Sequence, residues 1–180
     1  MLQSKKKSFN QIKIHSQYSI CEGALKIENL KEYCKKNKIQ SVGLSDTYNL
    51  SGALEFSENI SSVGTQPIIG SQVQFKFKNT YGIIPLIAKN YKGYKNIIEL
   101  SSKAYLENDD NDQPHCSIED LTKYSDGIIV LSGAINNLIG NMFNKGLFEE
   151  LDELISILNN NFIENFYLEI QRHGDKNEKE

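Results

Sequence analysis

The sequence predicts an α/β fold, a distorted, TIM-like β/α barrel that is incomplete at its C-terminal end. Six strand-like segments alternate with helical segments, an order typical of mainly parallel α/β folds. A complete barrel typically needs about 250 residues, whereas this chain has 180. Hydrophobic residues make up 39% and charged residues 24%, which is enough apolar material for one packed core. We expect residues 9–174 to form this domain, between an N-terminal tail at 1–8 and a charged tail or truncation point at 175–180.

Alternation and spacing define the elements of the first half of the chain. Residues 11–15 alternate polar and apolar side chains, as a strand with one buried face does. Ile27, Leu30 and Cys34 recur at helical spacing. The elements expected here are a strand at 11–15, a helix at 26–37, a strand at 41–45 that stops at the turn beginning with Asp46, a helix at 52–61, and strands at 67–77 and 83–88 joined by a Lys/Asn/Gly turn.

The second half shows a strong helix and a clear helix start. Residues 91–106 carry apolar side chains at amphipathic helical spacing, and residues 107–115 form a polar loop. Ser117 is followed three residues later by Asp120, a pattern of the capping-box type that starts a helix. The elements that follow are a continuous apolar strand at 127–131, a helix at 147–158 and a strand at 165–171.

Composition excludes several functional classes. The chain has 20 basic and 23 acidic residues, a net charge of −3, so it lacks a general basic surface for nucleic acid. Any DNA contact would be local or made by another part of a larger assembly. We expect no secretory signal and no membrane span, because no long apolar run follows the N-terminal lysines or occurs elsewhere. Three widely spaced cysteines, with no CxxC pair, favour reduced thiols and the cytoplasm.

Three ligand-type residues fall where strands are expected to end. In β/α barrels the active site lies at the C-terminal ends of the strands, and these ends carry His15, Asp46 and His173. Imidazole and carboxylate groups suit Zn, Mn or Fe. Each residue also has an ordinary structural interpretation, because a strand-end histidine is often only hydrogen-bonded and Asp46 precedes a turn. No glycine-rich phosphate loop or GxSxG nucleophile motif competes with this site.

The neighbouring basic residues weaken the metal interpretation. Lys13 lies two residues before His15, so both side chains would face the same side of the strand. An ammonium group there repels a divalent cation. We hypothesise that Lys13 pairs with Asp46 and supplies the positive charge, although a solvated lysine is the alternative. Arg172 adds a second cation beside His173.

Ordered sequence blocks over residues 9–174 carry a resemblance to a known family. These blocks are 15–19 with 23–27, 43–46, 49–56, 67–70, 86–90, 93–94, 102–106, 131–133 and 166–169. Together they resemble the polymerase and histidinol phosphatase (PHP) domain, in the branch found at the N-terminus of bacterial DNA polymerase III alpha subunits. Block 102–106 is typical of the polymerase branch. The resemblance implies a PHP-type barrel, which binds a cluster of metals in its active members.

Several positions that carry ligands in active PHP domains hold other residues here. By the resemblance, the residual ligand positions are His15, Asp46 and His173. The substituted positions are Lys13 for a histidine, Thr47 for a histidine, Gln72 for a glutamate, Ala134 for a cysteine and Arg172 for an aspartate. Because a metal cluster needs several anionic or neutral ligands, we expect these positions to bind no metal. We therefore expect no catalytic residue and no cofactor in this chain.

The resemblance implies a scaffold role within a replicative polymerase. DNA-directed DNA synthesis, a nucleotidyl transfer, would take place in the parent chain, with Mg²⁺ in its palm, and the 180-residue fragment alone would be inactive. The implied partners are the proofreading exonuclease subunit, the rest of the polymerase chain and, through the parent holoenzyme, DNA. One alternative is a stand-alone metal-dependent PHP phosphoesterase, which Lys13, Thr47 and Gln72 argue against. Another is a free scaffold with no polymerase attached.

Overall fold

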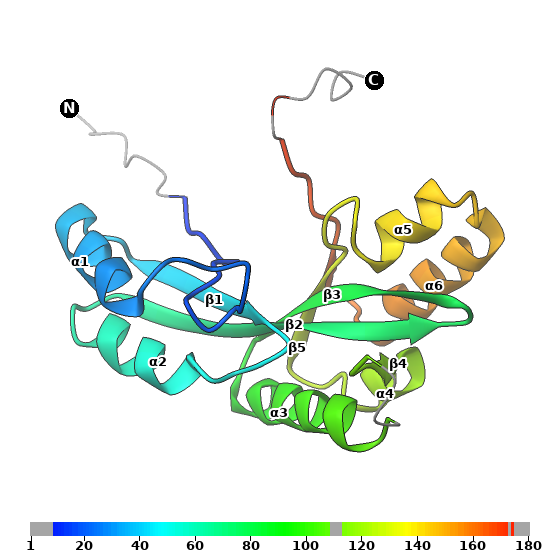
Figure 1. Ribbon diagram of the computed structural model, residues 1–180, viewed down its shortest axis with the longest axis horizontal. Helices are drawn as coiled ribbons and strands as arrows, with labels where there is room; N and C mark the ends of the chain where they lie inside the picture. The colour runs from blue at the N-terminus through cyan, green and yellow to red at the C-terminus, as the bar shows by residue number, and fades with distance from the viewer. Residues whose placement is uncertain (1–8, 109–112, 173, 175–180) are drawn as a thin grey trace.

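The computed structural model describes residues 9–108, 113–172 and 174, so both proposed tails, at 1–8 and 175–180, and part of the polar loop lie outside the described residues. Within the described part, no helix is long and apolar enough to cross a membrane. The elements in chain order are α1 (Ile27–Asn37), β1 (Ser41–Thr47), α2 (Ala53–Ser61), β2 (Gln66–Phe77), β3 (Thr80–Ala88), α3 (Tyr91–Leu106), β4 (Cys116–Ser117), α4 (Ile118–Lys123), β5 (Ile128–Leu131), α5 (Leu138–Asn144), α6 (Phe148–Asn161) and β6 (Phe166–Tyr167) (Figure 1).

Side-chain caps in the sequence explain where two of the helices, α3 and α4, begin. Asn90 caps α3 by accepting a hydrogen bond from the Gly93 N–H. At α4, Ser117 accepts from the Asp120 N–H while Asp120 accepts from the Ser117 N–H, which confirms the predicted capping box. The short helix α5 was not expected. It contains Gly140, a weak helix former, and Asn137 makes no side-chain capping bond there, so the sequence carries little helical signal.

The sheet is mixed, and the prediction of a mainly parallel fold was wrong. The sheet order is β1-β2-β3-β5-β6, with β4 pairing β2. β2 runs parallel to β1 but antiparallel to β3, and β3 runs antiparallel to β5. β2 and β3 are joined by a two-residue turn in which Lys78 has a φ of 50°. A parallel pair needs a long crossover, so a turn this short forces an antiparallel hairpin.

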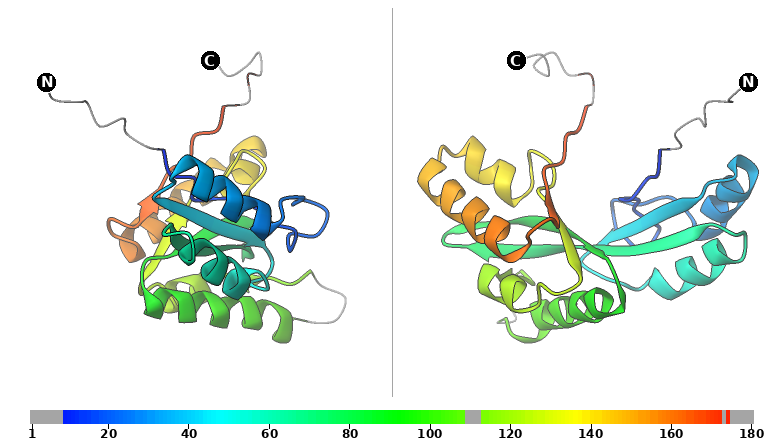
Figure 2. Two further views of the ribbon diagram at one scale, coloured as in Figure 1. Left: turned by 90° about the vertical axis from the view of Figure 1, so that its left-hand side faces the viewer. Right: turned by 180° about the vertical axis from the view of Figure 1, so that it is seen from behind.

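The long β2–β3 hairpin runs through both halves of the molecule. Figures 1 and 2 show β1, α1 and α2 at one end of the hairpin, and helices α3 to α6 around the other. Each end has its own apolar core. The smaller core includes Ile27, Leu44 and Phe56, and the larger includes Phe75, Leu100 and Leu154.

The barrel is not closed within the described residues. The expected strand at 11–15 reduces to one bridge, between Ile14 and Leu44, and the expected strand at 165–171 reduces to β6. Alternating apolar residues favour an extended backbone, but a ladder also needs a partner strand on the open side, which sequence alone does not reveal. The fold is therefore a mixed α/β fold with an open sheet.

The three cysteines are free, as predicted. Cys34 and Cys116 are buried, whereas Cys21 is exposed. Burial raises the pKa of the Cys116 thiol to about 12 and also raises the pKa of Cys34. Both buried thiols therefore stay protonated and behave as small apolar side chains.

Candidate functional site

A loop at residues 15–22, hereafter the 15–22 loop, lies against the end of β1 and the middle of β2. It begins where Ile14 joins β1, through the Ile14 N–H to the Gly43 carbonyl and the Ser45 N–H to the Ile14 carbonyl. The chain then turns back, and Ser16 forms a bridge with Leu25. Gly23 allows this close approach, because a Cβ there would lie 1.9 Å from the Ser16 carbonyl oxygen. The loop therefore places His15 at the edge of the sheet.

Asp46 anchors this loop and does not face an open site. Its carboxylate is 1% exposed. Oδ1 accepts the Ser16 N–H at 2.6 Å and the Ser19 hydroxyl at 2.7 Å, and Oδ2 accepts the Ser16 hydroxyl at 2.7 Å. Three donors therefore satisfy both oxygens.

Lys13 does not pair with Asp46, so that hypothesis was wrong. Its ammonium lies 2.5 Å from Glu169 Oε1, on the segment that follows β6. The Asp46 oxygens are already occupied by Ser16 and Ser19, whereas Glu169 offers a carboxylate across the open side of the sheet. Gln171 also donates to Glu169. Lys13 therefore connects the first and last segments of the open sheet.

His15 lies in a separate hydrogen-bonded group with Gln72, Thr47 and Glu22. The Gln72 amide nitrogen lies 3.0 Å from His15 Nε2 and 3.2 Å from Thr47 Oγ1. Thr47 donates to Glu22 Oε2 at 2.5 Å. His15 Nδ1 lies 3.3 Å from Ser19 Oγ and 3.8 Å from Glu22 Oε2. Since an amide nitrogen can only donate, His15 Nε2 accepts in this contact, and Nδ1 faces Ser19 and Glu22.

The structure brings together the two residual ligand positions that it describes. His15 and Asp46 share Ser19 as a neighbour, His173 lies outside the described residues, and Arg172 is exposed. Ala134 is half-buried. Sequence reasoning missed Glu22, Ser16 and Ser19, although serines one and four residues after His15 are of a type that favours loop hydrogen bonds.

The residues that the structure describes around His15 do not fit a metal cluster. Among the described residues, no group of three or more His, Cys, Asp or Glu side chains is placed to hold an ion. The groups nearest to His15 are neutral apart from Glu22, whose side chain is 49% exposed. One carboxylate and one imidazole leave a divalent cation under-coordinated.

Tyrosines border the site on both sides. Tyr18 donates to Glu55 at 2.6 Å, and this hydrogen bond raises the pKa of the Tyr18 phenol. Tyr48 follows Thr47 directly with a φ of 63°, an unusual conformation for an aromatic residue. Its hydroxyl donates to Gln74, and burial raises its pKa. Both phenols therefore remain neutral donors near pH 7.

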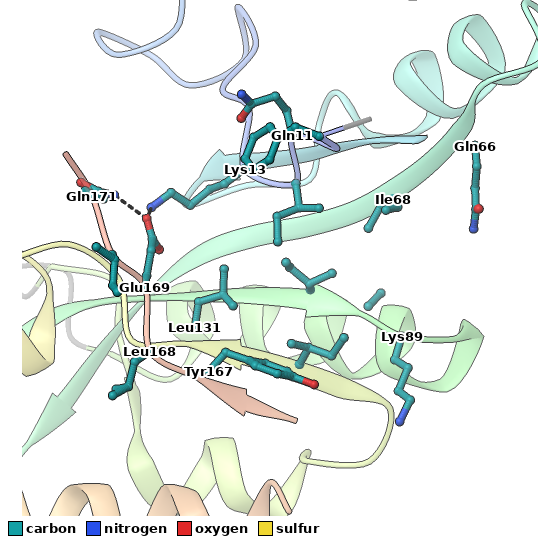
Figure 3. Close-up of a pocket in the computed structure, with 16 residues that line it drawn as sticks. Gln11, Lys13, Gln66, Ile68, Lys89, Leu131, Tyr167, Leu168, Glu169 and Gln171 are labelled. Carbon is teal, nitrogen blue, oxygen red and sulfur yellow. Dashed lines mark hydrogen bonds and ion pairs between the residues drawn. The ribbon is translucent and has the colours of Figure 1, made fainter. Parts of the chain in front are cut away.

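An apolar trough of about 850 Å³ lies between the two edge segments of the sheet. Ile12, Ile68, Leu131, Tyr167 and Leu168 are among its lining residues. Figure 3 shows Lys13 and Gln171 both reaching Glu169 at one end of the trough. Leu168 and Ile170 are 72% and 85% exposed, so large apolar side chains face solvent here.

The match to known families settles the classification. The PHP domain model matches residues 11–173. The chain belongs to the PHP domain family. This PHP domain is similar to the N-terminal region of DNA polymerase III alpha subunits. It is 36% identical to DNA polymerase III subunit alpha of Borreliella burgdorferi, over 94% of this chain and 16% of that one. The corresponding protein of Caulobacter vibrioides is 32% identical over 92% of this chain and 15% of its own length.

Solved structures support the fold of this PHP domain. One neighbour, from Bifidobacterium adolescentis, is described as a metal-dependent phosphoesterase. It is 10% identical, has a TM-score of 0.50, and the match covers 84% of this chain and 83% of that one. Another, an amidohydrolase from Chromobacterium violaceum, is 9% identical with a TM-score of 0.50, over 89% of this chain and 85% of its own. At these identities the likeness concerns the fold alone.

Proposed function

We propose that this chain is the N-terminal PHP domain of a DNA polymerase III alpha subunit, in which it acts as a structural scaffold with a degenerate metal site. The observation that carries the proposal is the match of 92–94% of the chain to alpha subunits at 32–36% identity. The chain spans only about one sixth of the length of these relatives. DNA synthesis would therefore belong to the parent chain, with Mg²⁺ in its palm, and this domain would supply no catalytic residue.

The open sheet supports a distorted PHP barrel that further strands of the parent chain complete. The trough presents apolar side chains between two extended segments, as the unfinished interior of a barrel would. The scaffold would pack against the catalytic module and dock the proofreading exonuclease subunit. DNA would be reached through the holoenzyme, in the cytoplasm.

The competing function is a stand-alone metal-dependent phosphoesterase. The fold of the neighbour from Bifidobacterium adolescentis favours it. The site argues against it, because Asp46 is fully hydrogen-bonded and Gln72 occupies the free nitrogen of His15.

The test begins with the gene sequence beyond codon 180, followed by assays of the complete protein. We expect the reading frame to continue into a polymerase, and the purified protein to extend a primed DNA template with Mg²⁺. With Mn²⁺ or Zn²⁺ we expect no release of phosphate from p-nitrophenyl phosphate above a no-enzyme control. Phosphate release that His15→Ala abolishes would instead support the phosphoesterase. A reading frame that ends at codon 180 would contradict the polymerase proposal.

A further inference from the structure

The polar cluster around His15 carries one inference beyond the proposed function. Its members come from three places: the 15–22 loop, the end of β1, and β2 at Gln72. Ser16 and Ser19 are 1% and 0% exposed, and Gln72 is 6% exposed. Water therefore does not compete strongly for these hydrogen bonds, and each lost bond leaves a buried group unpaired.

Asp46 ties the loop to β1 through Ser16 and Ser19. Ser19 also accepts the Thr47 N–H at 3.0 Å, which adds a backbone link between the loop and the same strand. Gly52, just before α2, packs closely against Asp46, because a Cβ there would lie 3.1 Å from Asp46 Oδ2. Direct hydrogen bonds to β1 therefore hold the side of the loop that contains Ser16 and Ser19.

Gln72 ties the loop to β2 through His15. Its amide donates both to His15 Nε2 and to Thr47 Oγ1, so it occupies the ring nitrogen that points away from the loop. An ion could reach this nitrogen only by displacing the Gln72 amide. The amide also brings no negative charge to balance such an ion.

We propose that Asp46 and Gln72 form a metal-independent clasp, which holds the 15–22 loop on β1 and β2 by hydrogen bonds in the place where the PHP family implies ions. Both are positioning residues. This inference rests on the proposed scaffold role, but its test measures ion content and amide exchange. The clasp can therefore be disproved while polymerase activity persists, and it can be supported even if polymerase activity is absent.

The test uses the complete protein, dialysed after exposure to Zn²⁺ or Mn²⁺, with hydrogen exchange followed over residues 15–22. We expect no stoichiometric zinc or manganese attributable to this domain, and the same exchange rates with and without EDTA. Gln72→Leu should speed exchange in the 15–22 loop about tenfold, because the hydrogen bond that ties His15 to β2 is lost. The matched control is Gln74→Leu, two residues along β2, whose bonds go to Tyr48 and Gln113 and not to the loop. It should leave exchange in the loop unchanged.

Two results would overturn the clasp. One is a bound ion that His15→Ala removes, together with exchange in the 15–22 loop that EDTA accelerates. The other is loop exchange in Gln72→Leu equal to that of the wild type. If Gln72→Leu does not fold, the EDTA comparison on the wild type still decides between the clasp and an ion.

Discussion

Single residues show which parts of the site predicted from the sequence were right and which were wrong. His15, Asp46, Thr47 and Gln72 do gather beside the end of β1. The strand ends themselves were misplaced, because β1 continues through Asp46 to Thr47 and residues 11–15 form only one bridge. The positions of Thr47 and Gln72 were expected from the family resemblance and not from alternation. The partners of Lys13 and Asp46 could not be predicted, since they depend on a loop and on a segment 156 residues away from Lys13. Ser16 and Ser19 take the carboxylate that Lys13 was expected to share.

The Lys13–Glu169 pair gives a prediction at this scale. The two side chains are 19% and 16% exposed, so the pair is largely shielded from water. Lys13→Met should lower the free energy of unfolding by about 1–2 kcal/mol, because Glu169 keeps its charge in a shielded place. Urea unfolding, read by fluorescence, measures the change. Lys145 is exposed, so Lys145→Met serves as the control and should change the free energy of unfolding by less than about 0.5 kcal/mol.

The charge-swapped double variant sharpens the test of the pair. Lys13→Glu combined with Glu169→Lys should recover part of the stability lost in either single variant. Additive losses in the double variant would show that the pair contributes no direct interaction.

At the scale of elements, local signals placed the longer helices but did not give strand direction. The expected helix at 91–106 matches α3 residue for residue, and the capping box places the start of α4. The β2–β3 hairpin shows the limit, because alternation identifies each strand but not the direction of its neighbour. β4 was also missed, since a two-residue strand has no periodicity to detect.

The α4 capping box gives a prediction about helix stability and pH. Burial favours a higher pKa for Asp120, but hydrogen bonds from Ser117 and Lys103 hold the pKa below its ordinary value. A lowered pKa in the folded state means that this stabilisation is present above the ordinary aspartate pKa of about 3.9 and is lost as the pH falls through the lower folded value. Ser117→Ala should cost about 1 kcal/mol at pH 7.

Thermal unfolding between pH 2 and pH 7 checks the capping prediction. The difference between wild type and Ser117→Ala should shrink at the acidic end, because protonated Asp120 caps poorly in either protein. If the stability difference between wild type and Ser117→Ala stays constant down to pH 2, the charge of Asp120 does not contribute to the capping of α4.

At the scale of the whole molecule, the sheet has two edges that approach each other across an apolar trough. The α/β class and the unclosed sheet were predicted, the second from chain length alone. The two-core arrangement around a shared hairpin was not, because it depends on which strands the hairpin pairs with at each end (Figure 2). The domain boundaries at 9 and 174 stay a prediction.

The exposed trough predicts how residues 1–180 behave when expressed alone. Exposed apolar side chains beside unpaired edge segments favour association between chains. Sedimentation velocity over a range of concentrations should show self-association, which Leu168→Lys combined with Ile170→Lys reduces. The matched control is Leu106→Lys with Ile163→Lys, at exposed apolar positions outside the trough lining. A chain that stays monomeric throughout, or a control that works equally well, would contradict this role of the trough.

The most direct test of the metal-free PHP scaffold is diffraction from crystals of the complete protein grown with Zn²⁺ and Mn²⁺. Data collected at the absorption edges of both metals locate any bound ion. The account predicts no anomalous peak beside His15, with the Gln72 amide in contact with the His15 ring. A peak coordinated by His15 in place of that contact would contradict it.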